Sequence, residues 1–130
     1  MHLANTNNLN FQPRTGAPIF TGEVNGAGLI DDTMTENMRM MVVKFSPGAR
    51  TKWHTHSFEQ GLVILEGKGI VASEKDGERV VTPGDVVVFG LGEKHWHGAT
   101  NLTGMAHIAI NLAGQNEVLE PVEKIQTPGV

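Results

Sequence analysis

Residues 61–89 read GLVILEGKGIVASEKDGERVVTPGDVVVF, and this stretch decides the fold class. Four short apolar runs, 61–65, 70–73, 78–81 and 86–89, alternate with turn-forming residues. The Asp76-Gly77 pair between the second and third runs is typical of a tight β-hairpin. Turn signals at intervals of about 8 to 12 residues, with short apolar runs between them, predict an all-β sandwich or barrel.

The sequence on either side of this stretch extends the same pattern. Residues 40–45 and 105–110 are predicted strands, whereas residues 1–38 are polar and rich in Gly, Asn and Thr. With 16 Gly, 6 Pro and 18% charged residues among 130, the chain fits one domain and argues against a helix bundle. We expect an N-terminal arm with edge strands at 1–38, a barrel at 39–113, and a C-terminal arm at 114–130.

Charge and composition exclude several classes of function. The net charge is −4 and lysines and arginines form no cluster, so the basic patch that nucleic-acid binding requires is missing. No apolar run approaches the ~18 residues of a membrane span, and no signal peptide is recognisable. Cysteine is absent, so any metal must be held by nitrogen and oxygen atoms. We therefore expect a cytoplasmic protein with a small-molecule substrate.

Histidines carry the strongest functional signal. Five of the six lie between positions 54 and 107, and four of these form the pairs His54-x-His56 and His95-x-His97. Residues two apart on a strand point to the same face, so each pair can direct two imidazoles into one interior. Neutral imidazole is the commonest nitrogen ligand of metals in proteins. The two pairs therefore predict a site for a divalent metal ion.

The spacing of these residues resembles the cupin superfamily. The first cupin motif is matched by Gly48, His54, His56, Gln60 and Gly67, and the second by Gly84, Gly90-Leu91-Gly92 and His95. The resemblance implies a single-domain cupin jelly roll, a double-stranded β-helix barrel that assembles as a homodimer or homotetramer. It also implies one divalent metal (Mn, Fe, Co, Ni or Zn, with Mn favoured) held by His54, His56, Gln60 and His95. The chain departs from the usual motifs at Gln60, Gly90 and Ala99, where Glu, Pro and Asn are common.

Position 60 has a neighbouring alternative, because Glu59 could serve as the ligand if the motif were one residue shorter. Gln60 is in phase with Leu62 and Ile64, so it shares their inward face if that face lines the barrel, and Glu59 then points outward. A neutral amide leaves a bound metal its full +2 charge. This favours a Lewis-acid role over redox cycling.

The stretch 92–100 together with 105–110 narrows the resemblance. It is similar to the small cupins of the carboxymuconolactone decarboxylase type, which include bacterial cupin hydroxynitrile lyases. This implies that His107 is the catalytic base, while His97 shares a face with His95 and could line the same cavity. Met41, Val43 and Phe45 alternate along a predicted strand and are expected to line the pocket.

The expected function is a metal-dependent lyase that acts on a small carbonyl-derived compound, in the manner of a hydroxynitrile lyase. Two alternatives stay open at this point. One is a metal-dependent dioxygenase of the quercetinase type, which a carboxylate in place of Gln60 would favour. The other is a cupin that binds a small molecule without catalysis.

Overall fold

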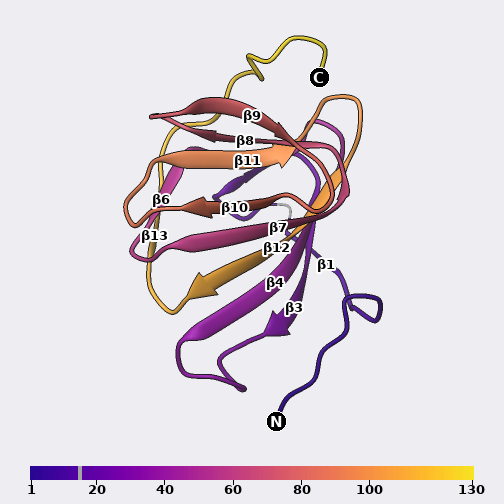
Figure 1. The fold of residues 1–130 in the computed structure, drawn as a ribbon, viewed down its shortest axis with the longest axis vertical. Helices are drawn as coiled ribbons and strands as arrows, with labels where there is room; N and C mark the ends of the chain where they lie inside the picture. Colours follow the sequence, from indigo (N-terminus) through magenta and orange to yellow (C-terminus); the bar gives the residue numbers. More distant parts are fainter. Residues whose placement is uncertain (15) are drawn as a thin grey trace.

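Two curled β-sheets make up the computed structural model, which describes residues 1–14 and 16–130 (Figure 1). The first sheet has the order β1 (Gln12–Pro13), β3 (Val24–Ile30), β4 (Met38–Phe45), β12 (Met105–Leu112), β7 (Gln60–Gly67), β10 (Val86–Phe89). The second has the order β13 (Asn116–Val118), β6 (His54–His56), β11 (His95–Ala99), β5 (Arg50–Thr51), β2 (Phe20–Thr21), with β8 (Gly69–Ser73) joining β11 to β9 (Gly77–Val81). All the pairings are antiparallel, and the all-β prediction is confirmed.

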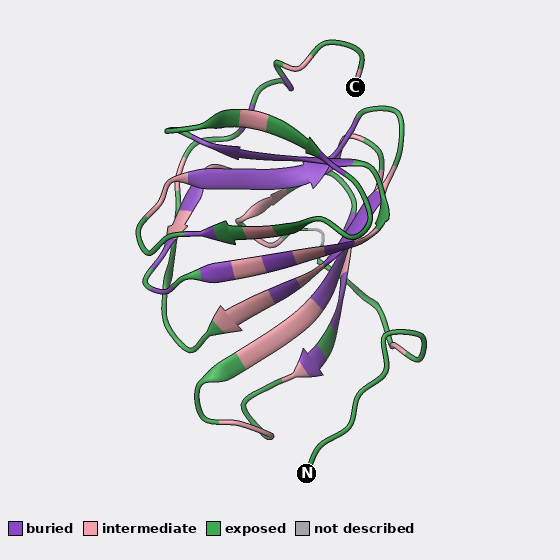
Figure 2. Ribbon diagram, in the orientation of Figure 1, coloured by how far each residue is buried: buried purple, intermediate pink, exposed green. Residues whose placement is uncertain are grey.

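Alternation along the strands of the first sheet places its inner face toward the shared interior. On β7, Gln60, Leu62 and Ile64 are buried, whereas the residues between them are half-buried, an alternation that Figure 2 shows along the strand. The core of the barrel includes Leu62, Ile64, Val43 and Phe45. The inner face therefore carries the core and, at the start of β7, a buried amide.

Strands β8 and β11 are buried along their whole length (Figure 2). Their inner sides face the barrel, and their outer sides are covered by the C-terminal arm. Trp96 and Ile70 pack there against Val122 and Ile125. The arm thus shields the histidine-bearing strand β11 from solvent.

Both terminal arms contribute strands to the sheets. The N-terminal arm contributes β3, a seven-residue strand paired with β4. The C-terminal arm contributes β13, which pairs with β6. The structure contains, over residues 1–14 and 16–130, no helix long and apolar enough to cross a membrane.

Candidate metal centre and adjacent histidine pair

Five histidines meet inside the barrel because β6 and β11 are neighbours in one sheet and β12 of the other sheet faces them. His54 and His56 lie on β6, His95 and His97 on β11, and His107 on β12, and each is at most 5% exposed. His95 is paired directly with His54 across the β6–β11 ladder, and their ring centroids are 4.2 Å apart. One nitrogen from each of His54, His95 and His97 lies within 4.8 Å of the others, close enough to hold a metal ion. This group shares His54 and His95 with the predicted donor set, but it contains His97 in place of His56.

Backbone carbonyls fix the orientation of two of these rings. His54 Nδ1 lies 2.8 Å from the Lys52 carbonyl oxygen, and His95 Nδ1 lies 2.7 Å from that of Glu93. A carbonyl can only accept a hydrogen bond, so Nδ1 carries the proton in both rings and Nε2 carries a lone pair. This is the arrangement of metal-binding histidines, whose second nitrogen donates to an oxygen of the surrounding protein.

His56 and Gln60 are held in the same manner by asparagines. His56 Nδ1 lies 2.6 Å from Asn116 Oδ1, which leaves its Nε2 buried and without a hydrogen-bond partner among the described residues. Gln60 Nε2 donates to Asn111 Oδ1 over 2.9 Å and so turns its own Oε1 toward the histidines.

Gln60 Oε1 lies 3.1 Å from His95 Nε2. With the proton of His95 on Nδ1, both of these atoms present lone pairs, and two lone pairs repel at this distance unless a cation lies between them. A divalent metal ion removes this repulsion. The donor chemistry of His54, His56, Gln60 and His95 therefore fits such an ion.

Burial keeps the imidazoles neutral. Burial in the barrel lowers the pKa of His54 to about 3 and that of His95 to about 4, and it also lowers the pKa of His56. A neutral ring is the form that binds a metal, so the donors require no deprotonation at pH 7. Phe89 stacks on the His95 ring with centroids 3.9 Å apart and keeps water from that side.

A second pair of histidines adjoins the first group. His107 Nε2 lies 3.0 Å from His97 Nδ1, so one ring donates a hydrogen bond to the other. Burial lowers the pKa of His107 to about 4 and holds that of His97 well below its ordinary value, so both are neutral at pH 7. His107 Nδ1 and His97 Nε2 are buried and have no hydrogen-bond partner in the described part of the chain. Because each neutral ring carries one proton, only one of these two outer nitrogens has a lone pair that can accept a proton, and the other carries an N–H.

The remaining predicted residues are arranged around these rings. Phe45 and Val43 are packed in the core, and the Phe45 ring lies 5.4 Å from that of His107. Met41 lines a cavity of about 200 Å³ at the open end of the first sheet, together with Ala109 and Asn111. Glu59 is exposed while Gln60 is 4% exposed, so the structure favours Gln60 over its neighbour as a donor.

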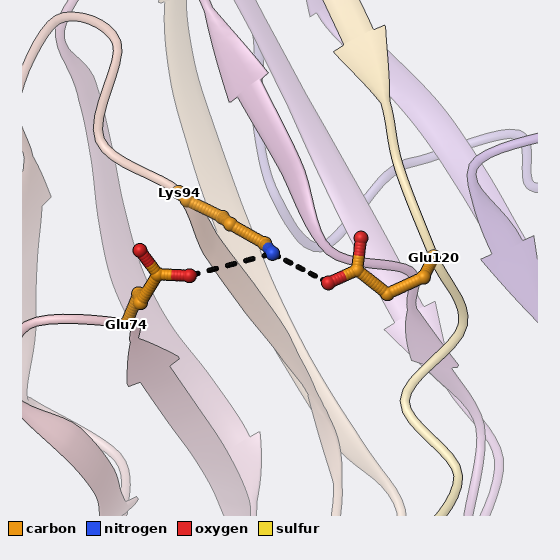
Figure 3. A network of polar contacts seen from close by, with 3 residues as sticks. All are labelled: Glu74, Lys94 and Glu120. Carbon is orange, nitrogen blue, oxygen red and sulfur yellow. Dashed lines mark hydrogen bonds and ion pairs between the residues drawn. The ribbon is translucent and has the colours of Figure 1, made fainter.

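The turn that leads into His95 is fixed from outside the barrel. Figure 3 shows the Lys94 ammonium reaching between Glu74, at 3.4 Å, and Glu120 of the C-terminal arm. The ammonium also lies 5.3 Å from the centre of the Trp53 ring, and Trp53 directly precedes His54. These surface ion pairs add little stability individually. Through these contacts, the segments that precede β6 and β11 are both linked to the C-terminal arm.

Asn111 and Asn116 are site residues that the sequence analysis missed. Each orients a predicted donor, Gln60 and His56 respectively, from a segment that follows the last histidine. Asn111 continues the inward phase of His107 and Ala109, and that phase could have revealed it. Asn116 lies in a three-residue exposed strand, which has no comparable signal.

Comparison with known proteins places this arrangement in a family. The family described as Cupin domain matches residues 41–110, more than half of the chain. The chain belongs to the cupin family. Its two sheets are accordingly the cupin jelly roll, and the predicted fold class is confirmed.

Two curated proteins illustrate the range of cupin relatives. A stretch of 68 residues, 52% of this chain, is 52% identical to the (R)-mandelonitrile lyase of Granulicella tundricola and spans 52% of that protein. A stretch of 99 residues, 68% of this chain, is 31% identical to a germin-like protein of Arabidopsis thaliana and spans 43% of it. The chain thus matches only about half the length of these relatives.

Solved structures agree with the fold. A cupin-like protein from Thermotoga maritima is 34% identical, with a TM-score of 0.79 over 84% of this chain and 85% of its own. The polyketide cyclase RemF from Streptomyces resistomycificus reaches a TM-score of 0.78 over 98% of this chain and 89% of its own, at 17% identity. The latter shows the fold alone.

Proposed function

We propose that this cupin is a metal-dependent hydroxynitrile lyase, which cleaves a small cyanohydrin into an aldehyde or ketone and hydrogen cyanide. The observation that carries the proposal is the neutral His97–His107 pair, buried directly beside the donors of His54, His56, Gln60 and His95. The 52% identity to a mandelonitrile lyase over half of the chain supports the choice of reaction.

The donors would hold one divalent ion, which when bound supplies Lewis-acid polarisation of an oxygen atom. His107 accepts the proton of the substrate hydroxyl group, and the O–H electron pair forms the second carbon–oxygen bond. The bond between that carbon and the nitrile carbon breaks, and its electron pair leaves with cyanide. Cyanide then takes the proton from the His107 imidazolium, which restores the neutral ring. His97 orients His107 through their 3.0 Å contact.

The test is a cleavage assay on protein stripped of metal and reloaded with Mn²⁺, Fe²⁺, Co²⁺, Ni²⁺ or Zn²⁺ in separate samples. Release of benzaldehyde from mandelonitrile, followed by its absorbance, is expected with at least one metal and should stop on chelation. Each metal without protein serves as the control. Protein that carries a full complement of each metal and cleaves no cyanohydrin would contradict the proposal and favour a binding protein.

We also propose that the working unit is a homodimer formed through the outer face of the first sheet. This face is apolar from β3 across to β10: Leu29, Met40, Leu65 and Ile108 cluster on it, and Val86 and Val88 extend it while more than 60% exposed. It contains a groove of about 460 Å³ beside the exposed Leu3.

The Lys44–Glu66 pair, 3.8 Å apart, gives this face one charge of each sign. In a dimer with a two-fold axis, the same surface of each copy forms the interface. A face that carries one positive and one negative charge can then pair each charge with the opposite charge of the second copy. A second copy of this chain is therefore the occupant that fits.

Light scattering is expected to give twice the 14.0 kDa mass of one chain. Ile108→Lys, which buries a charge in the interface, should shift the protein to single chains. Leu102→Lys is the control, because Leu102 is 74% exposed on a loop outside this face. A monomeric wild-type protein, or an Ile108→Lys variant that remains dimeric, would refute the proposal.

A further inference from the structure

The side chain of Arg14, an exposed residue of the N-terminal arm, reaches the first sheet at Gly26. Its backbone N–H donates to the Val24 carbonyl over 2.7 Å, which anchors the arm beside β3. A Cβ built on Gly26 would lie 2.9 Å from Arg14 Nε and 3.0 Å from Cε of the inward-facing Met41. The Arg14 side chain therefore lies over Gly26, where the absence of a Cβ leaves room for it.

The strand register relates Arg14 to the catalytic side of the barrel. Gly26 is paired with Val43, and Val43 with His107, so the three residues form one row across β3, β4 and β12. Adjacent strands are separated by about 4.8 Å, so this row spans about 10 Å. A small aromatic or aliphatic molecule can bridge that distance.

A cavity of about 200 Å³ occupies this end of the barrel. The lining residues that matter here are Arg14, Arg39, Asp31, Met41, Ala109 and Asn111. Asn111 is bonded to Gln60 over 2.9 Å, and Ala109 shares the inner face of β12 with His107. The cavity is thus adjacent to the proposed donors through Asn111 and to the histidine pair through Ala109, although no histidine lines it.

The charged side chains of this lining differ in whether they already have hydrogen-bond partners. Arg39 donates to the backbone carbonyls of Thr35 and Met38, and Asp31 accepts hydrogen bonds from Thr33. The structure records, over residues 1–14 and 16–130, no hydrogen bond or ion pair of the Arg14 guanidinium. The Arg14 guanidinium is therefore available to a ligand, and two cations face one carboxylate in this lining.

We propose that this cavity is a carboxylate subsite, in which Arg14 binds an anionic group at the end of the substrate remote from the reacting carbon. A guanidinium binds a carboxylate through two parallel hydrogen bonds, and the positive charge of Arg39 adds to the attraction. The native substrate is then a carboxylated aldehyde or its cyanohydrin rather than a neutral one. This inference rests on the proposed lyase function.

The test compares 4-formylbenzoate with benzaldehyde as substrates for cyanohydrin synthesis by the metal-loaded protein. The para carboxylate places a charge opposite the aldehyde without changing the reacting group. We expect kcat/KM to be at least about tenfold higher for 4-formylbenzoate, since a charge-assisted hydrogen bond has that magnitude. Arg14→Gln should abolish this ratio, Arg14→Lys should restore part of it, and Arg79→Gln on β9 is the matched control.

Calorimetric binding of 4-formylbenzoate separates the two proposals. If the protein has no lyase activity but binds 4-formylbenzoate about tenfold more weakly after Arg14→Gln, the carboxylate subsite stands and the lyase function fails. If the protein is an active lyase whose substrate ratio is near one and unaffected by Arg14→Gln, the subsite is refuted. Equal effects of Arg14→Gln and Arg79→Gln would also refute it, because they would indicate a general effect of net charge.

Discussion

The His54→Ala/His56→Ala double variant is expected to lose nearly all bound metal, from about one ion per chain to less than a tenth of that. Both substitutions remove an Nε2 lone pair that has no hydrogen-bond partner among the described residues, and the neighbouring donors His95 and Gln60 cannot complete a site alone. Metal analysis of the purified protein by mass spectrometry measures the effect.

Three single variants make this test specific. His2→Ala removes a histidine of the N-terminal arm and should leave the metal content unchanged. Gln60→Ala should weaken binding, whereas Glu59→Ala should not, because Glu59 is exposed and Gln60 faces the histidines. A double variant that keeps its full metal content, or a loss of metal with Glu59→Ala alone, would overturn the assignment of the ligands.

Replacing His107 with alanine is expected to lower kcat for mandelonitrile cleavage by roughly 10²–10⁴-fold while the metal content stays intact. His107 is the proposed proton acceptor, and its neutral ring contacts His97 rather than the four proposed donors. The readouts are initial rate and metal content of the same sample.

His107 is fully buried, so alanine also leaves a cavity beside Phe45. His107→Gln has similar volume and no basic nitrogen, and it should be as slow as His107→Ala but closer to the wild type in thermal unfolding. Loss of metal in the glutamine variant would make His107 a ligand. Retained activity would assign proton transfer to His97 instead.

Strand phase predicted which side chains of the candidate site reach the interior, because inward positions repeat every two residues. His54 with His56, His95 with His97, and Gln60 with Leu62 all reached the interior as alternation requires. The choice between Gln60 and Glu59 followed from phase alone, since a shift of one residue would move Leu62 and Ile64 out of the core.

The alternation of residues along a strand could not predict contacts between the two sheets. Alternation placed His97 and His107 inward separately, but their 3.0 Å contact depends on how β11 of one sheet faces β12 of the other. The bounds of β3 could not be read within the arm that was predicted to hold edge strands, because Gly26 and Gly28 weaken its strand pattern. The same Gly26 leaves room for the Arg14 side chain.

The bond between His56 and Asn116 has a thermodynamic consequence for the C-terminal arm. Asn116 lies on β13, and the same arm goes on to cover Trp96 and to meet Lys94. If His56 binds an ion as proposed, that ion favours the ring orientation that Asn116 holds, and ion binding and docking of the arm are then linked equilibria that strengthen each other equally. A truncation or a solvent that releases the arm therefore acts as a negative effector of metal affinity, although no residue after Asn116 belongs to the donor set.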